Sequence, residues 1–191
     1  ALRLLLRYAP ATGALYWRRR DVSMFKNGKY SAERAAAAWN SKLAGKRALT
    51  AVRKDGYQCG SVLGVNILAH RAIFAIVHGF YPPEIDHVQG VEAGNVIGNL
   101  REATSLTNSQ NQKRRRDNTS GTTGVHFSRR SGRWVAKIKV NYRAIHLGEF
   151  SSKDDAVRAR REAERVFGFH PNHGRPPVVR AKAEQPEMEG I

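Results

Sequence analysis

The spacing of apolar and polar residues in the first part of the chain predicts short helices and short strands. Residues 67–78 place apolar side chains at intervals close to 3.6, with Ile73 near the centre of the stripe and Gly79 as the expected end of a helix. Residues 32–43 have helical composition, and residues 14–17 are typical of a short strand after a turn. The pattern therefore predicts mixed α and β structure.

The middle of the chain predicts a strand, a loop, a second strand and a helix, in that order. Residues 54–57 form a hairpin-type turn signal, and the prolines at 82–83 favour extended backbone leading into residues 84–87. A glycine-rich loop follows, and residues 100–103 read as the second strand. Thr104 or Ser105 then caps a predicted helix that continues to about Lys113.

The last part of the chain predicts a three-stranded sheet with one helix behind it. Strands are expected over 125–127, 134–140 and 145–150, and a helix is expected after Ser151 or Ser152 and before Gly168. One face of the central strand carries Trp134, Ala136, Ile138 and Val140, and the other carries Val135, Lys137 and Lys139. The apolar stripe of the helix is expected to be Ala156, Ala159, Ala163, Val166 and Phe167. The fold class is therefore α+β.

The net charge of the chain limits the classes of molecule that it is expected to bind. The 191 residues carry a formal net charge of +17, and such a field attracts polyanions, most often nucleic acid. A single cysteine, Cys59, excludes an internal disulfide and a zinc site built from cysteine pairs. No apolar run approaches the ~20 residues of a membrane span, and residues 1–7 are too short and interrupted for a signal peptide. We expect a cytoplasmic protein that is not secreted, with no membrane partner.

Basic residues are distributed unevenly and suggest an organisation into domains. Residues 1–60 and 117–170 are strongly basic, whereas 61–116 are only mildly so. Four segments are expected: a basic N-terminal region that binds DNA or supports the next domain (1–60), a domain with the acidic and histidine chemistry (61–115), a β-rich domain (116–170) and a disordered tail (171–191). Residues 110–121 are polar and serve as the expected linker.

Asp86 and His87, at the end of a predicted strand, are the candidate chemical pair. Hydrolysis of a phosphodiester needs an attacking water, a base and a cation that stabilises the developing charge. An Asp carboxylate is a suitable ligand for Mg²⁺ or Mn²⁺, and a His is a suitable base near neutral pH. By itself an Asp-His pair is more often structural than catalytic, so the surrounding residues decide its interpretation.

The surrounding motifs resemble one family. The ordered set is His70-Arg71, Pro82-Pro83-x-Ile85-Asp86-His87, Asn99-Leu100-Arg101-x-Ala103-Thr104, Asn108 and Asn111. Upstream come Tyr8-x-Pro10-x-Thr12-Gly13-x-Leu15-x-Trp17, Trp39-Asn40, Ala44-Gly45-Lys46 and Asp55-Gly56-Tyr57. This combination, over most of residues 1–115, is similar to the HNH endonucleases of phage genomes and homing enzymes, which have a ββα-metal fold. The resemblance also implies a phage-encoded protein in a bacterial host cell.

The resemblance implies a role for each matching residue. Asp86 and Asn108 would be the protein ligands of a divalent metal, Mg²⁺ or Mn²⁺, and His87 would be the general base. Asn99 would orient His87. His70 and Arg71 match a His-Arg pair of the family, for which a catalytic role and a role in packing or phosphate contact are equally open. Members usually have Asn-Gly-Asp after the histidine and Asp-Asn-Arg further on, whereas this chain has Val91, Gly94 and Val96 in those stretches.

Residues 117–168 resemble a second family, the DNA-binding domain of plant ethylene-response factors. The matching residues are Asn118-x-Ser120-Gly121-x-x-Gly124-Val125, Gly132-x-Trp134-x-Ala136-x-Ile138 and Leu147-Gly148-x-Phe150. The resemblance implies a three-stranded sheet in the major groove of double-stranded DNA. Positions equivalent to the contacts of the family are His126, Ser128, Arg130, Lys137, Lys139, Ala144 and His146, and Arg143 is adjacent. Because Thr123, Ala144 and His146 differ from the family, the recognition sequence is not inherited.

Three functions are compatible with these patterns. The first is a metal-dependent endonuclease for duplex DNA, targeted by the C-terminal module. The second is a DNA-binding or regulatory protein with a degenerate nuclease site. The third is an RNA-binding protein, because basic stretches with Trp and Tyr also suit RNA, although the chain has no recognisable RNA-binding motif. No obligate protein partner is evident.

Overall fold

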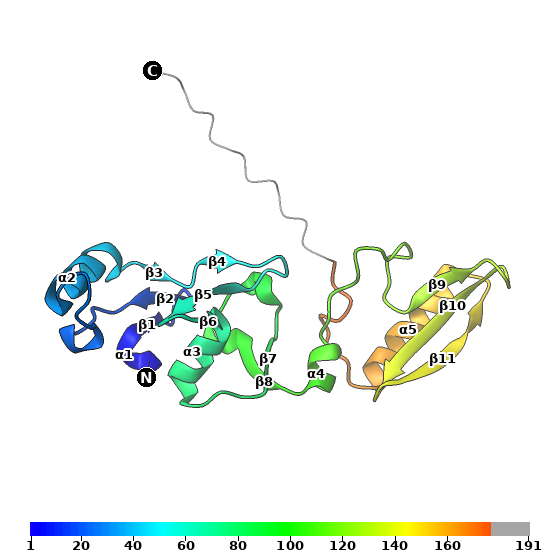
Figure 1. Cartoon of the computed structure of the whole chain (residues 1–191). Helices are drawn as coiled ribbons and strands as arrows, with labels where there is room; N and C mark the ends of the chain where they lie inside the picture. Colours follow the sequence, from blue (N-terminus) through cyan, green and yellow to red (C-terminus); the bar gives the residue numbers. More distant parts are fainter. Residues whose placement is uncertain (177–191) are drawn as a thin grey trace, which may run out of the picture. The chain divides into compact units, whose positions relative to one another are not determined.

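The computed structural model describes residues 1–176, and these residues form two compact units. The N-terminal unit is Ala1–Ser109, and the C-terminal unit begins at Gln110 (Figure 1). The expected boundary between residues 60 and 61 falls inside a strand, and the structure joins both segments in one unit.

The N-terminal unit begins with a small sheet and a helix. The elements are α1 (Leu2–Leu5), β1 (Leu6–Ala9), β2 (Ala14–Trp17), the short 3-10 helix η1 (Val22–Met24), α2 (Ala32–Leu43) and β3 (Arg47–Ala48). The strand over 14–17 and the helix over 32–43 are those predicted, and Ser31 caps α2 by accepting a hydrogen bond from Arg34 N. The sheet has the order β1-β2-β3 with antiparallel pairs.

A second three-stranded sheet leads into the central helix. Its strands are β4 (Ala51–Val52), β5 (Gln58–Val62) and β6 (Val65–Leu68), and the turn predicted over 54–57 connects the first two. The helix α3 (Ala69–His78) ends at Gly79, whose φ of 88° gives the left-handed cap that the sequence predicted. It begins two residues later than predicted, because Ile67 and Leu68 pair with β5 and belong to β6.

The predicted strand, loop, strand and helix follow. They are β7 (Glu84–His87), two 3-10 turns η2 (Val91–Ala93) and η3 (Ile97–Asn99), β8 (Leu100–Ala103) and α4 (Ser105–Ser109). In the antiparallel pair β7-β8, Asp86 lies opposite Arg101 and His87 opposite Leu100. The helix is shorter than predicted: Thr104 and Thr107 cap it reciprocally, and it ends at Ser109 rather than near Lys113.

One hydrophobic core holds the N-terminal unit together. Its buried residues come from the first sheet, the second sheet, α3 and the pair β7-β8, and include Leu6, Leu15, Val62, Ile73, Phe74, Ile85 and Leu100. Since residues before and after position 60 share this core, the basic segment 1–60 is part of the scaffold of the Asp86-His87 strand.

The C-terminal unit is the predicted sheet backed by a helix. Strands β9 (Val125–Ser128), β10 (Arg133–Val140) and β11 (Arg143–Phe150) lie in the order β11-β10-β9, and α5 (Lys153–Val166) packs on one face (Figure 1). Ser152 caps α5. The expected stripe is wrong at its end, because Val166 and Phe167 are 62% and 38% exposed.

Arg160 takes the place in the interface that apolar residues were expected to fill. Its side chain is 3% exposed, its Nη1 donates to the carbonyl of Lys137 at 2.7 Å, and its Nε pairs with Glu164 at 2.8 Å. A buried guanidinium costs desolvation energy unless its donors are satisfied. These bonds therefore fix α5 to the central strand with polar contacts, which a search for apolar positions does not find.

The expected linker is ordered within the C-terminal unit. The backbones of Gln110, Gln112 and Arg114 exchange hydrogen bonds with those of His170, Gly174 and Arg175. The predicted tail 171–191 is therefore bonded over its first residues, and 177–191 lie outside the described part of the chain. Of the helices in 1–176, none has the length and apolar character needed to cross a membrane. The fold class is α+β, as predicted.

Candidate functional site

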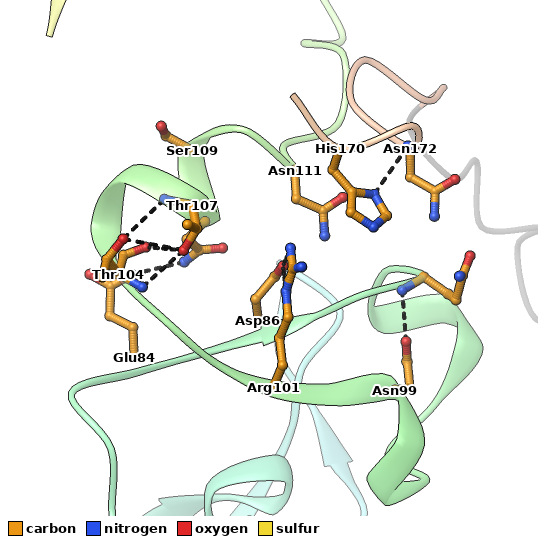
Figure 2. A network of polar contacts seen from close by, with 12 residues as sticks. Glu84, Asp86, Asn99, Arg101, Thr104, Thr107, Ser109, Asn111, His170 and Asn172 are labelled. Atoms are coloured by element: carbon orange, nitrogen blue, oxygen red, sulfur yellow. Dashed lines mark hydrogen bonds and ion pairs between the residues drawn. The ribbon is translucent and has the colours of Figure 1, made fainter. Parts of the chain in front are cut away.

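Asp86 is a buried carboxylate on β7 held by an arginine on the neighbouring strand. It is 5% exposed, and its Oδ2 accepts bonds from Nε of Arg101 at 3.1 Å and Nη2 at 2.8 Å (Figure 2). The two residues are direct cross-strand partners, so the register of β7-β8 determines the ion pair. A carboxylate buried in this way requires a cation beside it.

Glu84 extends the oxygen-rich face of β7. It lies two residues before Asp86, so both carboxylates lie on the same side of the strand. Ser105 Oγ and Asn108 Nδ2, both on α4, donate to Glu84, the second at 3.0 Å. These bonds, that of Ser105 first, lower the pKa of the Glu84 carboxyl. Asn108, expected to bind metal, therefore has its amide nitrogen on Glu84, which leaves Oδ1 as its only atom able to ligate a cation.

His87 is held by the loop that follows it. Its imidazole is 3% exposed, and Nε2 lies 2.9 Å from Oδ1 of Asn95. Asn95 Nδ2 in turn donates to Oε1 of Gln58 at 3.0 Å. Because Oδ1 only accepts, Nε2 carries a proton, and in the neutral ring the lone pair is then on Nδ1. The neutral tautomer of His87 is thus the one with a basic Nδ1.

Three rings pack together around His87. The ring centroid of Tyr57 lies 5.5 Å from that of His87 and 5.0 Å from that of His70, and the two imidazoles are 5.0 Å apart. Burial, then the neighbouring charges of His87 and Arg71, lowers the pKa of His70 to about 3. A neutral imidazole with so low a pKa is a weak base, so the geometry supports packing for His70 rather than proton transfer.

Asn99 has a different role from the one expected. It was predicted to orient His87, but the structure gives that contact to Asn95. Asn99 Oδ1 accepts from Gln89 N at 2.7 Å (Figure 2). Its Nδ2 donates to the carbonyls of Gly90 and Gly94 at 3.1 and 2.8 Å. Its amide therefore closes the loop after His87, and through that loop it acts on Asn95.

Arg71, for which packing, phosphate contact and catalysis were all open, contacts the protein backbone in this structure. Its Nη2 and Nη1 donate to the backbone carbonyls of Pro82 at 3.0 Å and Pro83 at 3.2 Å. Two prolines cannot donate hydrogen bonds of their own, and their carbonyls need external donors. Arg71 therefore fixes the segment that leads α3 into β7.

The donor set on β7 and α4 suits a hard cation. Among residues 1–176, no group of three or more His, Cys, Asp and Glu is placed to hold a metal ion. Mg²⁺, however, commonly binds one or two carboxylates and takes its other ligands from water and phosphate. Asp86 with Asn108 Oδ1 fits this requirement in ligand type, with Glu84 nearby. Arg101 currently supplies the positive charge beside Asp86.

The face of the C-terminal sheet that α5 leaves uncovered carries most of the residues expected to contact DNA. Lys137 pairs with His146 and Lys139 with Ala144 across β10-β11, and His126 pairs with Val135 across β9-β10. Cross-strand partners share a face, so these side chains lie with the two lysines. Both lysines, His126 and His146 are exposed. Residues 110–176 hold 16 Lys and Arg against 6 Asp and Glu.

The remaining predicted contacts lie at the ends of the strands. Ser128 pairs with Arg133 at the edge of the same face, and Arg130 lies in the turn between β9 and β10. Arg143 pairs with Val140, a position that alternates with the lysines, and it follows a hairpin turn in which Asn141 and Tyr142 have φ of 49° and 64°. Arg143 thus lies at the hairpin tip rather than on the lysine face.

The sequence did not predict the contacts of four residues around the Asp86-His87 strand, Tyr57, Gln58, Asn95 and Arg101, although Tyr57 and Arg101 belong to motifs of the resembled family. Tyr57 and Gln58 follow a hairpin turn far from β7 in sequence, and no local pattern links them to it. Arg101 has a usable signal, because it is opposite Asp86 once the two strands are paired.

Comparison of the chain with protein-family models, curated proteins and solved structures finds no match.

Proposed function

We propose that this protein is a metal-dependent endonuclease that hydrolyses phosphodiester bonds in duplex DNA. The observation that carries the proposal is the setting of His87: a buried imidazole at the end of β7, next to Asp86, with Nε2 bonded to Asn95 Oδ1. The order strand, loop, strand, helix around this pair and the high positive charge also support it.

In the proposed reaction His87 accepts the proton of the attacking water at Nδ1. The bond to Asn95 keeps the proton on Nε2 and orients the ring, so the base is prepared before substrate binds. Asp86, with Asn108, would hold Mg²⁺ or Mn²⁺, which when bound supplies positive charge to the developing phosphate dianion. Arg101 shields the buried charge of Asp86 until then. His70 keeps its neutral ring against His87.

The C-terminal sheet is proposed to bind the duplex. A three-stranded sheet fits the major groove, and the uncovered face presents Lys137 and Lys139 in alternate positions on the central strand. The phosphate backbone supplies most of the affinity of such a face. This module would place the nuclease unit on DNA.

The test is nicking of supercoiled plasmid by the full chain with Mg²⁺ or Mn²⁺. Cleavage should stop with a chelator and should fall by orders of magnitude in His87→Ala, while DNA affinity stays close to that of the wild type, because a base acts on water in the transition state. Metal-independent cleavage, or wild-type rates in His87→Ala, would contradict the proposal.

Two observations favour a second function, a DNA-binding protein with a degenerate nuclease site. The Arg101 guanidinium already neutralises Asp86, and the loop after His87 has Val91, Gly94 and Val96 where the resembled family has two carboxylates and an arginine. Specific DNA binding by the wild type with no cleavage in any divalent metal would select this second function.

A further inference from the structure

Gln58 belongs to a polar relay that runs into the imidazole of His87. Its Oε1 accepts from Asn95 Nδ2 at 3.0 Å, and Asn95 Oδ1 meets His87 Nε2 at 2.9 Å. The relay has a direction in this structure, because Asn95 uses its oxygen toward His87 and its nitrogen toward Gln58. Reversal of the Gln58 amide would reverse the Asn95 amide and move the imidazole proton from Nε2 to Nδ1.

The backbone that carries Asn95 is held without Gln58. The phenol of Tyr8 accepts from Ile97 N at 2.8 Å. Gly13 packs so closely on this segment that a Cβ there would lie 2.5 Å from Val96 N and 2.6 Å from the Asn95 carbonyl carbon. Asn99 closes the other side of the loop at the Gly94 carbonyl. The position of the Asn95 backbone is therefore fixed by several contacts. The contact with Gln58 acts only on the orientation of the Asn95 side-chain amide.

Gln58 lies at a suitable place for this task. It is the first residue of β5 and pairs with Val52 of β4, so its backbone belongs to the second sheet rather than to the β7-β8 pair. Its side chain and Asn95 both line a cavity of about 190 Å³ with Arg47 and Glu92. Gln58 thus approaches Asn95 from a strand that does not carry Asp86 or His87.

We propose that Gln58 is a positioning residue that sets the tautomer of His87 through Asn95, so that Nδ1 is the basic atom. The inference rests on the proposed function, in which His87 is the base. It assigns part of the preparation of that base to a strand that lies outside the strand-loop-strand-helix segment.

The test compares two replacements of nearly equal size in the full chain. The carboxylate introduced by Gln58→Glu can only accept hydrogen bonds, so this variant keeps the direction of the relay, whereas Gln58→Met removes the relay. We expect nicking with Mn²⁺ to fall about 10- to 100-fold in Gln58→Met and to be largely retained in Gln58→Glu. The control pair Gln112→Glu and Gln112→Met, at an exposed glutamine, should leave the rate unchanged.

A second measurement determines directly which nitrogen of the His87 imidazole carries the proton. Nitrogen NMR of histidine-labelled protein, with His87 assigned by its absence in His87→Phe, should show the proton on Nε2 in wild type and in Gln58→Glu, and a mixture of tautomers in Gln58→Met. Equal tautomer populations and rates in the two variants would overturn the inference, as would a proton on Nδ1 in wild type. If no variant cleaves DNA but the tautomers change as stated, the nuclease proposal fails and the positioning role stands.

Discussion

The imidazole of His70 lies edge-on to that of His87, with ring centroids 5.0 Å apart and an interplanar angle of 71°. Both rings are buried, and one of them, His70, is kept neutral because its protonation would place a charge in a dry site beside the other. This arrangement couples the stability of the site to pH.

We predict that His70 makes the folded state less stable in acid. The unfolded chain protonates this imidazole below about pH 6.5, whereas the folded protein keeps it neutral to a pKa of about 3, so the unfolded state binds more protons in that window. Stability contributed by neutral His70 is therefore present at pH 7 and falls by about 1.4 kcal/mol per pH unit from about pH 6 downwards.

The check is the free energy of unfolding against pH for wild type and His70→Phe, which keeps a ring in the cluster. The variant should show a flatter curve between pH 6.5 and the acid end of the titration. His78→Phe, which removes an exposed imidazole from the same helix, is the matched control and should keep the slope of the wild type. Parallel curves for His70→Phe and wild type would show that His70 binds its proton equally well in the folded and unfolded states, so that folding does not lower its pKa.

A second prediction concerns the Asp86-Arg101 pair. The Asp86 side chain is 7% exposed and that of Arg101 40%, so Arg101→Met leaves a buried carboxylate without its cation. We expect a loss of about 1 to 3 kcal/mol in unfolding free energy. Because Asp86 is a proposed metal ligand, Mn²⁺ should raise the melting temperature of Arg101→Met more than that of wild type.

The control for this prediction is another arginine-aspartate pair. Arg53 and Asp55 are 55% and 45% exposed, and exposed pairs contribute about 0–1 kcal/mol. Arg53→Met should therefore change stability little and should respond to Mn²⁺ as the wild type does. An equal Mn²⁺ response in both variants would place the cation away from Asp86.

Several elements of the fold could be predicted from the sequence, and one domain boundary could not. The helix over 32–43, the Gly79 cap, the pair β7-β8 and the sheet of the C-terminal unit follow from local periodicity and turn chemistry, which is short-range information. The boundary at residue 60 is different. Segment 1–60 has no local sign that it shares a core with α3, and only the tertiary packing unites them.

The same limit applies to the candidate site. The positions of Asp86 and His87 on a strand were predictable, because they follow from the pattern of residues 84–87. Which asparagine contacts His87 was not, since Asn95 and Asn99 lie in one irregular loop whose path depends on turns with positive φ at Gly90 and Gly94. Residue identity gives the possible hydrogen-bond partners of His87, and only the loop geometry decides between them.

A third prediction tests how α5 is fixed to β10. Gly124 has φ of 76°, and a Cβ there would collide with the Lys137 carbonyl oxygen and lie 2.7 Å from Nη1 of Arg160. Gly124→Ala should therefore cost about 3 kcal/mol or more in the unfolding of the C-terminal unit. Gly132→Ala, with φ of 65° and no atom within 4 Å, isolates the backbone term and should cost about 1 kcal/mol. Equal losses of unfolding free energy in the two variants would show that the Lys137 carbonyl and Arg160 move away from the added Cβ without an energetic cost.

The final prediction concerns the proposed DNA face of the C-terminal sheet. Lys137 and Lys139 are exposed on the side of β10 opposite α5, whereas Arg161 is exposed on α5 itself. If the face binds phosphates, Lys137→Met and Lys139→Met should each reduce the slope of log affinity against log salt concentration by about 0.9, because each lysine releases about one counterion from the duplex. Arg161→Met removes the same charge from the helix side and should leave the slope near that of the wild type. Fluorescence anisotropy of a labelled duplex at several salt concentrations measures all four proteins. Equal changes in the three variants would mean that net charge alone drives binding, and a change in Arg161→Met alone would place the DNA on the helix side of the sheet.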